Sequence, residues 1–321
     1  MKSIIDIARQ RAQGNQSLVP TLIKEILHYD ILRAISASPL SSKIVFQGGT
    51  SLRLCHDNAR YSEDLDFVLN DIDTELKPTD IESFRDTVVR SINKEWGLPI
   101  TVTGPDDPAF NAEADHIEVK KWTAKIQIPK ANPAEKNPGI IRVEIAHVCA
   151  YDAFPMFIRN NFAEHLARPQ IILRVESREE ILADKLIAFA YRPRWKFRDL
   201  WDIKFLCDNR IKLNPKWYFQ KAQDYRQIAS QEDADSALDA ILKRSAELGK
   251  SINDASFQKA FQAEMTRFVD APLAKQLEDR DVCQGFLRSV QYHVDRSIQQ
   301  LEQHLSNDPD NTPAGGLSLK L

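Results

Sequence analysis

The pattern of apolar and polar positions divides the chain into a mixed first half and a helical second half. Near the N-terminus, apolar residues recur every three or four positions and predict a helix that ends at Ser38-Pro39; they are Leu18, Leu22, Ile26, Leu27, Ile31, Leu32 and Ile35. Apolar runs predict strands at residues 43–47 and 64–69, with a short helix between them at residues 50–56. A longer helix is predicted at residues 78–97 because the segment begins at Pro-Thr-Asp and ends at a glycine.

Three further strand-like runs follow at residues 99–103, 117–128 and 139–147. The segment between the last two runs is rich in proline and asparagine, which is typical of a hairpin connection. The first half is therefore predicted to be an α+β unit around a small mixed sheet.

From Ser177 onward the pattern is almost entirely helical. Helices are predicted at residues 178–191, 197–209, 215–229, 232–248, 254–268 and 272–305, and the last segment is long enough for two helices. Residues 306–321 mix Asp, Asn, Pro, Gly and Ser without periodicity, which predicts a disordered tail. We expect a first domain at residues 1–170, a helical domain at residues 171–305, and then this tail.

The composition is typical of a soluble globular protein, with 43% hydrophobic and 28% charged residues among 321. A net charge of −3 argues against a protein that coats nucleic acid, although it permits a local basic patch. The four cysteines lie far apart and show neither zinc-type nor disulfide-type spacing. An early charge at the N-terminus and the absence of a long apolar run argue against a signal peptide and a membrane span, so we expect a cytoplasmic protein.

Two glycines and two hydroxyl side chains occupy the turn from the first strand into the short helix: Gly48, Gly49, Thr50 and Ser51. Such turns are common as purely structural elements, with glycine for tight geometry and Thr50 or Ser51 as the helix cap. The same turn also suits a phosphate, because backbone amides at a helix start and a nearby hydroxyl bind anions. The spacing excludes a P-loop and a G-x-S-x-G nucleophile turn.

Two carboxylates, Asp64 and Asp66, open the next strand. Residues two apart on a strand share a face, so both acids are expected to point away from the core. A solvated strand edge would explain them without any function, but like charges on one face repel each other and bound Mg²⁺ removes that repulsion. Glu144, on a later strand, is a candidate third ligand or general base, although ordinary polar alternation also predicts an acid there.

Further polar candidates flank these elements. Arg60 and Ser62 directly precede the acidic strand and are either caps or phosphate contacts. Lys185 lies on an apolar stripe of the helix at residues 178–191, where a snorkelling lysine would look the same.

The next helix carries Arg198, Asp199 and Asp202. Arg198 and Asp202 have the i, i+4 spacing of an ordinary surface pair, and the two aspartates share a face. The preceding linker holds three basic residues interleaved with aromatic ones, which suits RNA phosphates and an unstacked base; the basic residues are Arg192, Arg194 and Lys196.

Together these residues resemble the AbiEii/AbiGii-type nucleotidyltransferases, the toxins of AbiE-like, type IV-like toxin–antitoxin systems, to which the MenT toxins also belong. The similar segments are residues 48–54, 60–67, 183–186 and 198–202. The resemblance implies a polymerase-β-like nucleotidyltransferase fold with a helical C-terminal region that completes the active site.

The resemblance also implies site roles. Mg²⁺ or Mn²⁺ is expected on Asp64 and Asp66, with Glu144 as the candidate third ligand. Lys185 is expected to neutralise phosphate charge, and Asp199 or Asp202 to supply a further catalytic acid. The expected nucleotide-binding residues are Gly48, Gly49, Thr50, Ser51, Arg60, Ser62 and Arg198, and the expected RNA-binding residues are Arg192, Arg194 and Lys196.

In MenT-type members a nucleotide is transferred from a nucleoside triphosphate to the 3′ end of tRNA, and a neighbouring gene usually encodes a winged-helix antitoxin. We therefore expect an RNA acceptor, an antitoxin partner and a role in phage defence. Two other functions stay open: nucleotidyl transfer to a protein or small-molecule hydroxyl, and non-catalytic binding of a nucleoside triphosphate. Whether RNase or protease removes a transferred label distinguishes an RNA acceptor from a protein acceptor. Release of pyrophosphate distinguishes an enzyme from a non-catalytic binding protein.

Overall fold

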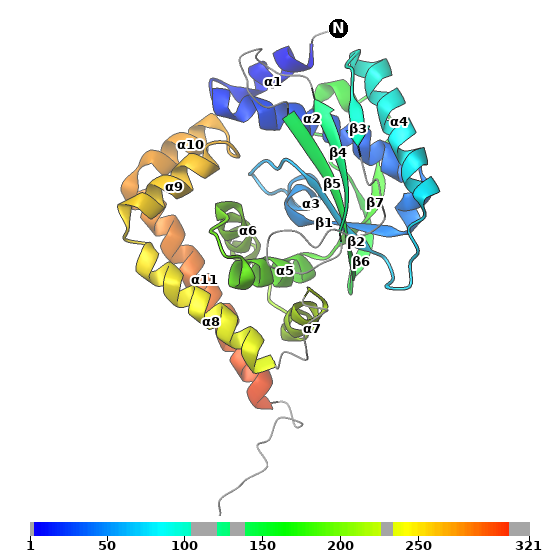
Figure 1. The fold of residues 1–321 in the computed structure, drawn as a ribbon. Helices are drawn as coiled ribbons and strands as arrows, with labels where there is room; N and C mark the ends of the chain where they lie inside the picture. The colour runs from blue at the N-terminus through cyan, green and yellow to red at the C-terminus, as the bar shows by residue number, and fades with distance from the viewer. Residues whose placement is uncertain (1–2, 104–120, 129–138, 226–233, 308–321) are drawn as a thin grey trace, which may run out of the picture.

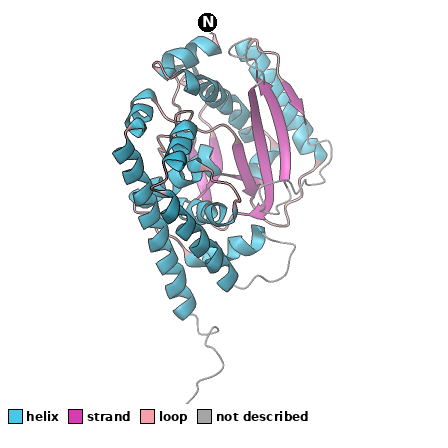
Figure 2. Cartoon of the chain, turned by 60° about the vertical axis from the view of Figure 1, so that its left-hand side comes forward, coloured by secondary structure: helices cyan, strands magenta, loops and turns pink. Residues whose placement is uncertain are grey.

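The computed structural model describes residues 3–103, 121–128, 139–225 and 234–307, which form a mixed sheet with helices on both faces (Figures 1 and 2). The first elements are α1 (Ile4–Ala12), η1 (Gln16–Leu18), α2 (Val19–Ser36), η2 (Pro39–Ser42), β1 (Ile44–Gln47), α3 (Gly48–Cys55), β2 (Leu65–Leu69) and α4 (Pro78–Trp96). They are followed by β3 (Thr101–Thr103), β4 (Lys121–Ile128), β5 (Gly139–Cys149), β6 (Ala153–Phe157), η3 (Ala163–His165) and β7 (Ile172–Glu176).

The remaining elements are helices: α5 (Arg178–Tyr191), α6 (Phe197–Asp208), α7 (Pro215–Tyr225), α8 (Ala234–Ser251), α9 (Ala255–Met265), α10 (Ala271–Glu278) and α11 (Arg280–Asn307). The segment predicted at residues 272–305 is thus two helices. Ser306 and Asn307 still belong to α11, so the helix continues two residues into the predicted tail. Residues 308–321, and residues 226–229 and 232–233 of two predicted helices, lie outside the described segments.

In the described segments, seven strands form one sheet in the order β3-β4-β5-β2-β1-β7-β6. β1 pairs antiparallel with β2 and parallel with β7, and β2 pairs parallel with β5. β4 and β5 pair antiparallel, with Ile128 opposite Gly139, which confirms the predicted hairpin although its connection at residues 129–138 is not described. The predicted α+β class, with a mixed sheet followed by a helical region, is confirmed.

One α-helix and two strands were not predicted from the sequence: α1, β6 and β7. β6 is a short edge strand that contains Pro155 and leaves Phe154 and Phe157 exposed, so it lacks an alternating pattern. β7 lies within the stretch expected to separate two domains, yet it pairs with β1 near the centre of the sheet. The sheet therefore continues beyond residue 170, and the division into two domains stays a prediction.

The sheet separates two hydrophobic cores because side chains alternate along each strand. On one face, Phe46 and Phe67 pack with α1, α2 and α4. On the other face, Val45, Val68 and Ala146 pack with the helices from α5 onward. Figure 1 shows this arrangement, with the C-terminal helices wrapped along one side of the sheet. No helix in the described segments is long and apolar enough to cross a membrane.

Candidate active site

Three polar residues form a row across the centre of the sheet. Gln47 on β1 lies opposite Asp66 on β2, and Asp66 lies opposite Glu144 on β5. Residues directly opposite on paired strands point to the same face. Because Asp66 is two residues from Val68, this face is the one covered by the helical half of the chain. The register therefore brings Asp66 and Glu144 together beneath the C-terminal helices.

The two glycines at the start of α3 allow the chain to turn tightly beside these acids. Gly48 has φ +80°, and a Cβ atom there would lie 2.8 Å from Asp66 Oδ2. A Cβ atom on Gly49 would clash with the Arg60 guanidinium and lie 3.1 Å from Ser62 Oγ. Close approach to Asp66 thus requires glycine at position 48, and a side chain at position 49 would displace the buried Arg60 guanidinium.

The hydroxyls of the turn are buried and bonded within the protein. Thr50 Oγ1 donates to the Asp64 carbonyl at 2.5 Å, and Ser51 Oγ donates to the Gly48 carbonyl at 2.9 Å. These bonds fix the turn against the start of the acidic strand. Binding of a phosphate by Thr50 or Ser51 stays a prediction.

Asp64 lies one residue before β2 and keeps 26% of its side chain exposed. The Arg142 amide donates to Asp64 Oδ1 at 3.0 Å, and the Arg142 guanidinium lies 3.7 Å from Oδ2. Burial, followed by the negative charge of Asp66, raises the pKa of Asp64. The two aspartates are therefore close enough to repel each other, which favours a cation between or beside them.

The acidic side chains at the site fit Mg²⁺ or Mn²⁺ as a site with two protein ligands. No group of three or more His, Cys, Asp or Glu side chains in the described part of the chain is arranged to hold a metal. Asp64 and Asp66 fit a site with two carboxylate ligands that is completed by substrate phosphates and water, which is how Mg²⁺ is usually bound. A third-ligand role for Glu144 stays a prediction.

A buried network of charges from α5 and α6 faces the sheet. The Lys185 ammonium lies 2.9 Å from Asp199 Oδ1 and 2.9 Å from Asp202 Oδ2. Arg60, only 2% exposed, donates from Nε to Asp202 Oδ1 at 2.7 Å and from Nη2 to Oδ2. Asn58 Nδ2 donates to Asp202 Oδ1 at 2.8 Å. Asp202 therefore has all its acceptors engaged.

The charges of this network fix its ionisation. Burial disfavours the charged ammonium of Lys185, but the negative charges of Asp199 and Asp202 outweigh it and raise the pKa of Lys185. Burial also opposes ionisation of Asp199, yet Arg192 and Lys185 lower its pKa far below the ordinary value. Both aspartates are thus anionic and Lys185 is cationic at neutral pH.

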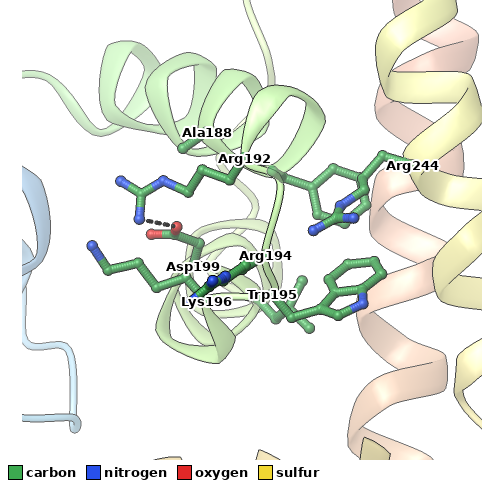
Figure 3. A pocket seen from close by; sticks show the side chains of 9 residues that line it. Ala188, Arg192, Arg194, Trp195, Lys196, Asp199 and Arg244 are labelled. Carbon is green, nitrogen blue, oxygen red and sulfur yellow. Dashed lines mark ion pairs between the residues drawn. The ribbon is translucent and has the colours of Figure 1, made fainter. Parts of the chain in front are cut away.

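Next to Asp199 is a small recess that opens to solvent. It is lined by Ala188, Phe189, Arg192, Arg194, Trp195, Lys196, Asp199, Leu200 and Arg244. Arg192 Nη1 lies 3.3 Å from Asp199 Oδ2, the pair marked in Figure 3. The Arg244 guanidinium lies 3.6 Å over the Trp195 ring. The structure therefore brings the three predicted RNA-binding residues to the edge of the charged network.

Two predicted nucleotide contacts have structural partners instead. Arg60 is buried against Asp202, as described above. Arg198 lies 3.6 Å from Glu264 and 4.0 Å from Glu63, with its guanidinium 4.4 Å over the Phe268 ring. The Arg198–Asp202 surface pair suggested by the i, i+4 spacing is not formed among the described residues, because Asp202 points inward. Nucleotide contacts by Arg60 and Arg198 stay predictions.

Asn58 and Arg244 were not predicted from the sequence as site residues. Asn58 is fully buried and accepts a hydrogen bond from Trp201 Nε1 at 3.0 Å while it donates to Asp202. Arg244 comes from α8 and completes the recess. Both contacts join segments that are distant in the chain, so no local spacing of residues predicts them.

Comparison with known proteins identifies the family. Residues 30–286 match the family described as nucleotidyl transferase AbiEii toxin of type IV toxin–antitoxin systems. The chain belongs to this family. The recognised resemblance and the nucleotidyltransferase fold class are therefore confirmed, and the chain is a nucleotidyltransferase-toxin family member over most of its length.

Comparison with solved structures finds matches at low sequence identity. The nucleotidyltransferase toxin MenT4 of Mycobacterium tuberculosis is 16% identical, with 94% of this chain and 99% of that chain covered and a TM-score of 0.49. JHP933 of Helicobacter pylori is 18% identical, with 88% and 94% covered and a TM-score of 0.46. No curated protein sequence matches the chain.

Proposed function

We propose that this AbiEii-family protein is a metal-dependent toxin that transfers a nucleoside monophosphate from a nucleoside triphosphate to an RNA acceptor, such as the 3′ end of tRNA. The observation that supports the proposal most is the contact between the glycine turn and the acidic strand, with a Gly48 Cβ placed 2.8 Å from Asp66 Oδ2. A turn that holds phosphates and acids that hold Mg²⁺ must be adjacent for both to act on one triphosphate.

The reaction needs little covalent chemistry from the protein. An acceptor hydroxyl oxygen attacks the α-phosphorus, the bond from that phosphorus to the bridging oxygen breaks, and pyrophosphate leaves with the bond electrons. The backbone at Gly48 and Gly49 would bind phosphate oxygens. Lys185 and Arg192, both fixed by Asp199, would place positive charge at the edge of the site.

Asp64 and Asp66 would hold the Mg²⁺, which neutralises phosphate charge and activates the attacking oxygen. Glu144, one strand away from Asp66, is the candidate base for the hydroxyl proton. Both proposed roles follow from the chemistry of carboxylate groups, and substitution of the three acids tests them.

The choice of an RNA acceptor is supported by the basic recess beside the network. Arg192, Arg194, Lys196 and Arg244 line it, and Trp195 supplies an aromatic surface on which a base can stack. We further propose a cytoplasmic location, a partner antitoxin of the winged-helix type, and a role in phage defence, in keeping with a type IV toxin family.

The test is transfer of label from each α-³²P nucleoside triphosphate to tRNA in the presence of Mg²⁺. Wild-type protein should label RNA in a form that RNase removes and protease does not, and EDTA should stop the reaction. Asp66→Asn should reduce transfer by more than ~10²-fold, since the proposed transfer depends on the bound ion. Asp71→Asn, at an exposed acid just after the same strand, is the matched control and should leave transfer unchanged.

Retained transfer by Asp66→Asn would refute the proposed site. Label that protease removes, with RNA unlabelled, would favour a protein acceptor. Absence of pyrophosphate release with all four triphosphates would favour a non-catalytic binding protein.

A further inference from the structure

Lys196 lies where the two halves of the candidate site face each other. It is the residue that caps the start of α6, and Asp199 N donates to its carbonyl at 2.9 Å. Figure 3 shows its ammonium beside the Arg192 guanidinium, both extended towards the blue ribbon of the first half of the chain. Trp195 and Arg244 lie on the opposite side of the recess in the same view. Lys196 therefore points towards the first half of the chain and away from the aromatic surface.

Among the described residues, the acids near Lys196 are already engaged by other cations or lie farther away. Lys185 has Asp199 and Asp202 within 2.9 Å, and Arg192 has Asp199 at 3.3 Å. In the described part of the chain, no residue makes an ion pair or hydrogen bond with the Lys196 side chain. The two nearest acids act on it only at longer range: Asp199, which is already neutralised, and Asp66 on the sheet.

The surroundings of Lys196 disfavour its charge. Burial, followed by the positive charge of Arg192, lowers the pKa of Lys196 to about 8. At neutral pH the side chain is still mostly protonated, and it is a partly buried cation without a paired acid among the residues that the structure describes. A ligand anion placed there would remove an existing electrostatic cost, which is a favourable contribution to binding.

The position relative to Asp66 restricts the kind of anion. A single phosphodiester of an RNA backbone beside Asp66 would be repelled by that carboxylate. A triphosphate brings several negative charges together with Mg²⁺, and the metal offsets Asp66 while the lysine offsets the remaining charge. Lysine binds phosphate as a point charge that does not require one fixed orientation. Arg194 is exposed at the rim, where an RNA backbone can reach it without approaching Asp66.

We propose that Lys196 binds the triphosphate of the nucleotide substrate, opposite the Gly48–Gly49 turn, and does not contact the RNA acceptor. This inference rests on the proposed nucleotidyl transfer, and it replaces the RNA-binding role expected from the sequence. The phosphates would lie between a turn from the sheet half and a lysine from the helical half. Nucleotide binding would therefore join the two halves.

The experiment separates nucleotide binding from RNA binding without requiring turnover. A non-reactive α,β-methylene nucleoside triphosphate with Mg²⁺ is titrated against wild-type protein and three variants, Lys196→Met, Lys196→Arg and Arg194→Met. Lys196→Met should weaken binding by at least ~10-fold, which corresponds to loss of one charge-assisted hydrogen bond. Lys196→Arg should restore most of the affinity, and Arg194→Met should stay within about twofold of wild type because its side chain is at the rim.

Binding of tRNA is measured on the same four proteins. Lys196→Met should retain tRNA affinity within about twofold, whereas Arg194→Met should weaken it. Thermal unfolding of each variant shows whether the fold is intact, and Lys196→Arg tests the role of the charge if Lys196→Met unfolds. Unchanged analogue affinity in Lys196→Met would overturn the proposal, as would loss of tRNA binding alone or no analogue binding by wild type.

The two proposals fail in different ways. If wild-type protein binds the analogue through Lys196 but labels no acceptor, the proposed transfer is wrong and the triphosphate site stands. If transfer requires Asp66 while Lys196→Met changes neither analogue affinity nor the KM for the triphosphate, the transfer stands and the role of Lys196 is wrong.

Discussion

At the scale of single residues, Gly48 tests how closely the turn must approach the acids. Gly48→Ala forces a side chain into φ +80°, which costs about 1–2 kcal/mol, and it pushes Asp66 away. Transfer should fall at least ~10-fold, since a small displacement of a catalytic group has a large effect on rate. The measurement is kcat together with the free energy of unfolding.

The matched control is Gly285→Ala, at an exposed position near the start of α11. No atom lies within 4 Å of the added methyl group, so the change should stabilise the helix by up to about 1 kcal/mol and leave kcat unchanged. Equal kcat values for Gly48→Ala and wild type would show that the turn does not position the reacting groups.

Asp199 and Asp202 are predicted to differ in their roles. Asp202 is fully buried and binds Arg60, Lys185 and Asn58, so Asp202→Ala leaves two buried cations short of a counterion. The free energy of unfolding should fall by about 3–5 kcal/mol. Asp199 lines the recess, so Asp199→Asn should mainly reduce transfer.

Urea unfolding and the labelling assay on both variants make this comparison. A stable but inactive Asp202→Ala would instead place that aspartate in the chemistry. The sequence left open which aspartate acts, because the i, i+3 spacing puts both on one face. Only the long-range contact with Arg60 separates them.

At the scale of elements, the sequence predicted those features that depend on neighbouring residues in the chain. The turn residues, the acidic strand and the helix at Arg178–Tyr191 follow from periodicity and glycine placement. The directions in which the charged side chains of α5 point do not follow from these local patterns. Asp184 binds Lys221 at 3.0 Å on one side, and the next residue, Lys185, reaches the site network on the other. These partners come from distant parts of the chain. The sequence motif at residues 183–186 therefore could not show that its aspartate and its lysine bind different groups.

Helix α2 is joined to its surroundings by two buried histidines. His28 Nε2 lies 3.1 Å from the Glu63 carbonyl, and His165 Nε2 lies 3.1 Å from the carbonyl of Ile26 on α2. Burial lowers the pKa of both histidines to about 3. The unfolded chain therefore binds more protons than the folded one between pH 6.5 and 3, and the free energy of unfolding falls as the pH falls. Each histidine should contribute a slope of up to about 1.4 kcal/mol per pH unit.

Urea unfolding between pH 7.5 and 5 measures this slope. His165→Gln keeps a donor for the Ile26 carbonyl and removes one titrating group, so the slope should become shallower. A free energy of unfolding that is constant from pH 6.5 to 5 would contradict neutral buried histidines.

At the scale of the whole molecule, the helical half covers one face of the sheet and also reaches the N-terminal segments. Tyr61 N donates to the Phe268 carbonyl at 2.7 Å, and the Asn15 side chain donates to the Thr266 carbonyl at 2.8 Å. The sequence predicted both halves as separate patterns but not these contacts, because they depend on how the chain folds back. The candidate site lies between the halves for the same reason.

A truncation tests whether the two halves depend on each other. A chain that ends at Asn209 lacks α7 to α11 and exposes Leu200 and Trp201, which pack in the second core with Phe261 and Leu287. Exposing this apolar surface to water costs more free energy than the usual net stability of a domain, which is about 5–15 kcal/mol. The truncated protein should lose its cooperative unfolding transition and bind a hydrophobic dye, as compact states with exposed cores do. A chain that ends at Asn307 keeps every described residue and should unfold in one transition like the full chain; cooperative unfolding of the shorter chain would instead show that the sheet half is an independent domain.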